Sequence, residues 1–268
     1  MTRYGRWGAV MLALLALFAI LGPWLAGDPN AQPDPVHASL QLPSAAHWLG
    51  TDQLSRDLLA RLAVGARISL VVATIAVAVA AAIGSLLGLL AGTAPGAVGS
   101  LLQRLIDLGL ALPRIIVLLV VLAAVGQVHY ALLGAILGAT GWPAVARLVR
   151  GETLRLRQAA YVTAASALGA PPHRVLWREI FPGTAPAVLV ASTLGLADAI
   201  LLEAGLSFIG VGVRPPDASW GGMLYEARDY IGSAPWLVFV PCVALVAATS
   251  AATLLGDALR RSLQPESR

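Results

Sequence analysis

Four charged residues interrupt long apolar runs of the sequence, and this setting restricts what they can do. They are Asp107, Arg114, Asp198 and Glu203. A charged side chain is costly in hydrocarbon, so such residues either line a path for a solute or form internal ion pairs. Asp107 lies three residues after Arg104, a spacing that allows a local pair on one helix. Arg114 follows Pro113, and we expect it to pair with a carboxylate on another helix.

Side chains suited to metal binding or nucleophilic chemistry are few and lack the required spacing. The four histidines are His37, His47, His129 and His173. They form no HExxH pattern, and the single cysteine, Cys242, has no partner cysteine. Every basic residue is arginine, so the chain has no lysine for a P-loop or a Schiff base. We therefore expect a non-catalytic chain with no catalytic residues, no metal site and no cofactor of its own.

The composition explains what must position these residues. The 268-residue chain is 58% hydrophobic and 12% charged, with a mean hydropathy of +0.78. Ordinary soluble domains are about 25% charged. This deficit of charge predicts an all-α membrane protein with several spans. The basic balance then reflects arginines near the span ends, not a nucleic-acid partner.

Six runs are long and apolar enough to cross a bilayer as helices. They cover about 7–26, 68–92, 103–125, 130–147, 185–208 and 236–258. The first follows Arg3 and Arg6, and its length favours an uncleaved span over a signal peptide. The third contains Pro113, and the fourth contains a break at Gly141–Pro143.

The arginines also predict the orientation. With both termini cytoplasmic, the inner segments hold twelve arginines and the outer segments hold five. We expect a multi-pass protein of the bacterial inner membrane. Residues 1–66 then form a first span and an extracytoplasmic segment, 67–262 form the transmembrane core, and 263–268 form a cytoplasmic tail. A cytoplasmic loop covers about 147–184 within the core.

Two outer segments end in amphipathic patterns. Helices are expected around 55–66 and 220–230, either as docking sites for an external protein or as amphipathic helices at the membrane surface. Asp57 and Arg61 are one turn apart and are predicted to form a surface ion pair.

The cytoplasmic loop predicts a helical hairpin. Residues 150–170 favour a helix, which Gly169 and the two following prolines, Pro171 and Pro172, would end. A second short helix follows, and Pro182 and Gly183 are expected to close it. The first helix is rich in alanine, which leaves a face with little side-chain bulk. This face either docks another protein or merely belongs to a linker.

The hairpin and several other segments resemble one family, the inner-membrane permease subunits of binding-protein-dependent ABC importers of the dipeptide, oligopeptide and nickel branch. "YVTAASALGA" followed by "REIFP" resembles the cytoplasmic coupling motif of that family. The resemblance covers roughly residues 46 to 265, in order and spacing, through "HWLGTDQLSRDLLARLAVGARISL", "RLIDLGLALP", "GWPAVARLVRGETLRLRQAAYV", "LSFIGVGVRPPDASWGGML" and "LLGDALRRSLQP".

The resemblance implies the type I ABC importer permease fold and a set of partners. A second homologous permease subunit would complete the pathway, and two ATPase subunits would bind ATP and Mg²⁺ beneath it. An extracytoplasmic solute-binding protein would deliver the solute, and membrane lipids would surround the spans. The cargo would be a peptide or related small solute. A nickel complex is the alternative within the family, and a stand-alone secondary transporter is a competing class, which would favour internal repeats.

The resemblance also assigns roles to particular positions. The residues implied in ATPase coupling are Tyr161, Thr163, Ala164, Ala165, Ala167, Leu168, Gly169, Ala170, Pro171, Pro172 and Pro182. Those expected to contact the binding protein are Arg56, Asp57, Trp220 and Glu226. The family usually has a glutamate where this chain has Thr163, an asparagine at Gly183 and a leucine at Phe181. Any ion pair made through that glutamate therefore cannot form here.

Overall fold

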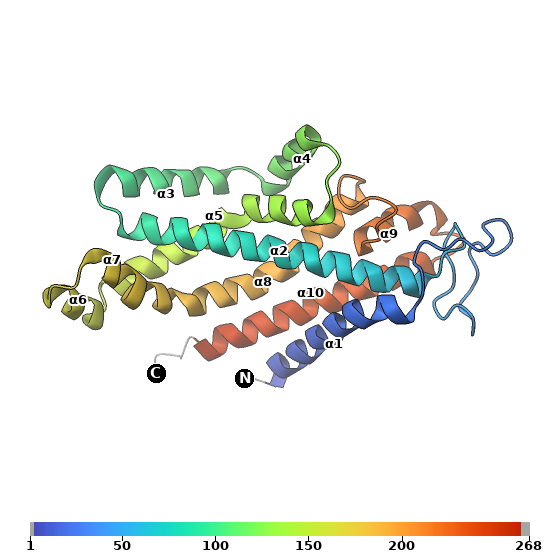
Figure 1. Ribbon diagram of the computed structural model, residues 1–268, viewed down its shortest axis with the longest axis horizontal. Coiled ribbons are helices and arrows are strands. Elements are labelled where there is room, and N and C mark those ends of the chain that lie inside the picture. The colour runs from blue at the N-terminus through green and yellow to red at the C-terminus, as the bar shows by residue number, and fades with distance from the viewer. Residues whose placement is uncertain (1–2, 264–268) are drawn as a thin grey trace.

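The computed structural model describes residues 3–263 and shows a bundle of long helices lying side by side (Figure 1). In this range, five helices are long and apolar enough to cross a membrane. They are α1 Arg3–Leu25, α2 Leu58–Thr93, α5 Tyr130–Arg157, α8 Phe181–Phe208 and α10 Trp236–Leu263. The described chain contains no strand. The predicted all-α membrane fold is confirmed.

A bent helix pair gives a sixth crossing when its two helices are taken as one span. Helix α3, Gly96–Ala111, and helix α4, Arg114–Val125, meet at an angle of 87° and count as one span when taken together. This pair corresponds to the predicted third span, 103–125, and it bends at Pro113 because a proline disfavours a helical conformation at the residue before it. Leu112 is accordingly extended, with φ −86° and ψ 133°. The span is broken at this point.

Helices α2 and α5 are both longer than the predicted spans 68–92 and 130–147. Helix α2 begins at Leu58, so the expected outer amphipathic helix and the second span are one 36-residue helix that runs through residues 66–67. Asp57 caps its start by accepting a hydrogen bond of 2.9 Å from the backbone N–H of Ala60. Helix α5 continues through Pro143 without the expected break.

Close contact between α2 and α5 depends on glycines. A Cβ atom at Gly138 would lie 2.6 Å from the carbonyl oxygen of Ala76, and one at Gly88 would lie 2.6 Å from that of Ala146. The two backbones can approach this closely only because these positions carry no side chain. The main core forms beside them, where α2, α5, α8, α10 and the short helix α9, Trp220–Ala227, meet.

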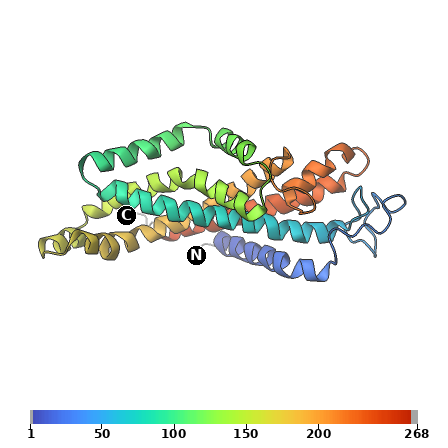
Figure 2. The same cartoon turned by 45° about the horizontal axis from the view of Figure 1, so that its top comes forward.

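The two ends of the bundle are different. Segment 26–57 and α9 lie at one end, and the hairpin of α6, Ala160–Ala167, and α7, Pro172–Arg174, projects from the other (Figures 1 and 2). The terminal ends of α1 and α10 both point toward the hairpin end (Figure 1). The last residues of the predicted tail, 264–268, lie outside the described residues.

Candidate functional site

The turn of the hairpin is a complete Schellman motif. The N–H of Gly169 donates to the carbonyl of Ser166 at 3.0 Å, and the N–H of Ala170 donates to that of Ala165 at 3.1 Å. Gly169 has φ +83°, in the left-handed region that glycine adopts most easily. The predicted helix stop at Gly169 is confirmed, and the turn has one defined geometry.

Two details of the hairpin were predicted wrongly. The first helix is interrupted at Gln158 and Ala159, which separate α5 from α6. Pro182 and Gly183 do not close the second helix, because the π-helical turn η1, Val175–Ile180, continues directly into α8. Pro182 lies in the first turn of α8, where its missing N–H would otherwise donate to the carbonyl of Arg178. A π-helical turn accommodates such a lost bond, and the hairpin is therefore continuous with a membrane span.

The inner side of the hairpin is held by a separate apolar cluster. Val162 of α6 and Val175 and Ile180 of η1 are buried against Leu89 of α2 and Leu156 of α5. The guanidinium of Arg157 also donates a hydrogen bond of 2.8 Å to the carbonyl of Gly92. These contacts join the hairpin to the ends of α2 and α5.

The outer side of the hairpin is open. The exposed residues among those implied in coupling are Tyr161, Thr163, Ala164, Ala167, Leu168, Gly169, Pro171, Pro172 and Pro182, and Ala165 and Ala170 are half-buried. Leu168 is 89% exposed at the tip. Thr163 donates its hydroxyl to the carbonyl of Ala160 at 3.0 Å, so it is satisfied within its own helix. The exposed residues of this face are uncharged and mostly small or proline, with Tyr161 beside them and Leu168 at the tip.

The charged residues of the spans form interhelical pairs. Arg114 at the start of α4 donates to Asp198 of α8 at 2.7 Å, which supplies the carboxylate expected on another helix. Asp107 pairs with Arg147 of α5 at 3.0 Å rather than with Arg104. The local pair fails because Arg147 reaches Asp107 from the neighbouring helix.

Glu203 is fully buried and accepts two hydrogen bonds from serines. Ser69 of α2 and Ser207 of α8 each donate to one of its carboxylate oxygens at 2.7 Å. The same two hydroxyls accept backbone N–H groups of the segment 209–220 that follows α8, from Trp220 at 3.4 Å and Val213 at 3.0 Å. Glu203 therefore joins α2, α8 and the segment 209–220 at one point.

A second buried polar cluster, which we call the outer cluster, lies at the end of the bundle opposite the hairpin. Arg56 and Arg61 both donate to Glu226 of α9, at 2.5 and 3.0 Å, and Arg56 also donates to Asp52 at 2.5 Å. Arg61 is almost completely buried. The predicted surface pair of Asp57 with Arg61 is thus wrong, because Arg61 turns inward to Glu226 while Asp57 contacts His47 at 2.8 Å.

Most of the side chains expected to contact an external binding protein are buried within this chain. Arg56 and Trp220 are buried within the chain, and Glu226 is mostly buried, so these side chains hold α9 against α2. Asp57 is half-buried. A direct contact with a partner would have to come from exposed parts of the same elements.

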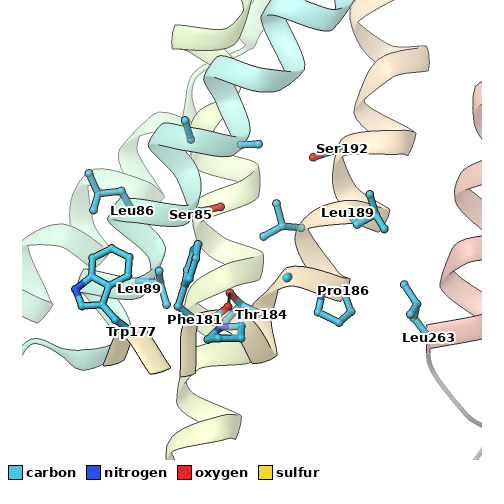
Figure 3. Close-up of a pocket in the computed structure, with 15 residues that line it drawn as sticks. Ser85, Leu86, Leu89, Trp177, Phe181, Thr184, Pro186, Leu189, Ser192 and Leu263 are labelled. Carbon is cyan, nitrogen blue, oxygen red and sulfur yellow. Dashed lines mark hydrogen bonds between the residues drawn. The ribbon is translucent and has the colours of Figure 1, made fainter. Parts of the chain in front are cut away.

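A groove follows the half of α8 nearest the hairpin, which we call its inner half, and we call the other half its outer half. The cavity of this groove, of about 820 Å³, lies between α2, α8 and the end of α10. Figure 3 shows Ser85 of α2 on the side toward Ser192 of α8, with Trp177 and Phe181 at the hairpin end. A smaller cavity of about 170 Å³ continues from Ser192 to Arg114 and Asp198. Both cavities are lined by Ser192, and we call the two neighbouring cavities together the α8 tract.

Sequence reasoning missed the partners that complete these clusters. Asp52, Ser69 and Ser207 carried no signal, because an isolated serine or aspartate in a sequence does not reveal which distant residue it contacts. In residues 3–263, no three histidine, cysteine or acidic side chains gather as a metal site would require.

Comparisons with known proteins agree on one kind of relative. Residues 84–268 match the family described as binding-protein-dependent transport system inner membrane component. The chain is similar to a dipeptide transport system permease protein of Alkalihalophilus pseudofirmus, with 36% identity over 97% of this chain and 84% of the relative. It is also similar to a probable peptide ABC transporter permease of Sinorhizobium fredii, with 42% identity over 97% and 88%. A putative peptide permease of Brucella suis is 38% identical over 98% and 87%.

Proposed function

The chain belongs to the family of inner-membrane components of binding-protein-dependent transport systems, and we propose that its cargo is a peptide. It is a permease subunit of an ABC importer and a multi-pass membrane protein. The peptide assignment is supported by relatives whose names specify dipeptides or peptides at 36–42% identity over most of both chains.

Membership of this family implies ATPase and solute-binding partners. The proposed assembly pairs this chain with a second, homologous permease subunit and two ATPase subunits, which bind ATP and Mg²⁺. Both termini and the hairpin face the cytoplasm in this proposal, and lipids surround the spans. The excess of arginines at that end supports the orientation.

The hairpin is the proposed docking site for an ATPase subunit. The observation that carries this role is the combination of an open, uncharged outer face with a turn fixed by the Schellman bonds at Gly169. A face of small side chains lets a partner's surface approach the backbone closely. The buried side, at Val162 and Val175, then transfers a push on that face to the membrane helices.

Helix α8 is the proposed route of that movement. Its buried residues cluster in the outer half of the helix, from Ala197 to Ser207. In the inner half, from Phe181 to Leu196, Thr184 is the one buried residue among those that the structure describes. The outer half is pinned through Glu203, and the inner half is flanked by the α8 tract. Because η1 continues into α8, displacement of the hairpin would swing the inner half about this pinned end, a hinge-type movement between two states.

Co-purification and uptake test the proposal together. A tagged chain extracted from its own membrane is expected to bring down an ATPase subunit and a second permease subunit. After reconstitution in vesicles with the binding protein, the complex is expected to accumulate radiolabelled dialanine or a longer peptide only with ATP. Failure to recover an ATPase would contradict the importer assembly, and ATP hydrolysis without uptake of any peptide would contradict the cargo.

A further inference from the structure

We infer that the carboxylate of Asp198, held by Arg114, is a binding site for the α-ammonium group of a peptide on its way through the membrane. This inference rests on the proposed peptide cargo and adds the residue and the chemical group it would recognise. It starts from the position of an exposed ion pair within the membrane-spanning part of the chain.

The position of Asp198 requires water or protein around it. Asp198 lies about 26 Å along the axis of α8 from Phe181 and about 15 Å from Phe208, at 1.5 Å per residue. Its side chain is nevertheless 61% exposed, and that of Arg114 is 30% exposed. Lipid tails do not tolerate a charge at this depth, so the pair must face an aqueous path or a polar partner.

Arg114 is fixed, which leaves Asp198 as the available group. Its guanidinium donates to the carbonyl of Leu137 at 2.8 Å, and it also contacts the Thr140 hydroxyl at 3.5 Å. Gly141 leaves the space, since a Cβ atom there would lie 2.8 Å from Nη2 of Arg114. Arg114 starts α4 after the break in the third span, and discontinuous helices commonly form solute sites in transporters.

Asp198 has capacity for a further donor. Arg114 occupies its Oδ2, and among the described residues no donor lies within hydrogen-bond distance of Oδ1. A free carboxylate oxygen beside an arginine accepts a cationic N–H donor through a charge-assisted hydrogen bond. The primary ammonium of a peptide fits this requirement. Because Arg114 already neutralises most of the charge, such binding is weak enough for the cargo to leave again.

The surroundings provide a route to this site. The α8 tract places cavities on both sides of Ser192, one beside Asp198 and one toward the hairpin end, and the larger cavity of about 820 Å³ lies within the roughly 300–1,000 Å³ typical of small-molecule sites. Apart from Arg114 and Asp198, the walls are small or apolar side chains and three hydroxyl side chains, Ser85, Thr184 and Ser192, so they would let different peptide side chains pass.

A charge swap separates recognition from structural support. In the reconstituted complex, Asp198→Asn is expected to lower ATP-driven uptake of radiolabelled dialanine about tenfold. The double variant Arg114→Asp with Asp198→Arg restores an ion pair of the reverse polarity. Recognition predicts that this swap stays as defective as Asp198→Asn, because the acceptor oxygen has moved. Rescue by the swap would show that the pair is structural and would overturn the inference, as would unchanged uptake in Asp198→Asn.

Three controls test the specificity of the Asp198 variant, the peptide cargo and a lipid amine as the bound group. Asp107→Asn removes the matched pair with Arg147, whose residues do not line the α8 tract, and should lower uptake less than about twofold. The wild-type complex tests the peptide cargo by itself, since absence of any peptide uptake there contradicts the cargo and not the site. Vesicles of phosphatidylglycerol alone test the source of the ammonium. If the defect of Asp198→Asn disappears in them, the bound amine belongs to phosphatidylethanolamine, and the inference fails.

Discussion

Ser69 of α2 donates a hydrogen bond of 2.7 Å to Glu203 of α8, across 134 positions of sequence and in a fully buried setting. This bond joins the longest helix of the bundle to the helix that continues into the hairpin. It fixes the outer half of α8, which is the stationary part in the proposed movement.

Removal of this donor should lower stability. Ser69→Ala leaves one buried carboxylate oxygen without its serine partner, at a cost of about 1–3 kcal/mol. Thermal unfolding of the purified complex would show the loss as a lower melting temperature. Thr74→Val is the control, because Thr74 lies on an exposed face of the same helix and bonds only to the carbonyl of Leu70 at 2.7 Å. Equal melting temperatures for the two variants would contradict a structural role for the bond.

The outer cluster should be more sensitive. Glu226→Gln leaves the buried Arg56 and Arg61 with one anion fewer, and loss of one partner from a buried ion pair costs about 3–5 kcal/mol. Glu152→Gln breaks an exposed pair with Arg155 and should cost at most about 1 kcal/mol. Chemical unfolding of both variants in the same detergent measures the difference. A cost for Glu226→Gln as small as that for Glu152→Gln would mean that water reaches the outer cluster.

Two glycines of α5 should respond in opposite directions to alanine. Gly138→Ala places a Cβ atom against the carbonyl of Ala76 and forces α2 and α5 apart, so the complex should become less stable. Gly151→Ala meets nothing within 4 Å and should stabilise the helix by about 0.5–1 kcal/mol. Melting temperatures of the two variants test this, and destabilisation by Gly151→Ala would indicate an unrecognised contact at that face.

Gly169 tests whether the shape of the hairpin turn matters for transport. The surrounding space is open, so a substitution acts through the positive φ and not through crowding. Gly169→Val should strain the turn by about 1–2 kcal/mol and lower the uptake obtained per ATP hydrolysed. Gly169→Asn should retain most of it, since asparagine tolerates this backbone region. Membrane insertion should be normal in both, and unchanged uptake in Gly169→Val would count against the coupling role.

Local signals in the sequence predicted much of the fold. The apolar runs identified the crossings because every backbone polar group in lipid must be satisfied within a helix. Gly169 followed by Pro171 predicted the hairpin turn for an equally local reason, the positive φ that glycine accepts. Pro182 was misjudged, because a proline in the first turn of a helix is tolerated and the helix continued.

Two ion pairs were predicted wrongly because the true partners lie far away in the sequence. The i,i+4 spacing of Asp57 and Arg61 suggested a surface pair, but Arg61 found Glu226 165 residues away. Asp107 likewise paired with Arg147 and not with its neighbour. Spacing on one helix identifies only local partners. Packing against a second helix decides whether a charged side chain pairs locally or with a residue of that second helix.

Cross-linking tests the central claim, that the hairpin contacts an ATPase subunit, most directly. In a Cys242→Ser background, Leu168→Cys places a single thiol at the exposed tip of the hairpin. Leu42→Cys places one at an exposed position of segment 26–57, which lies at the opposite end of the bundle. With a short thiol-to-amine cross-linker in native membranes, Leu168→Cys is expected to link to an ATPase subunit and Leu42→Cys is not. Cross-linking of the ATPase to Leu42→Cys, or to neither variant in a complex that still transports, would contradict the claim.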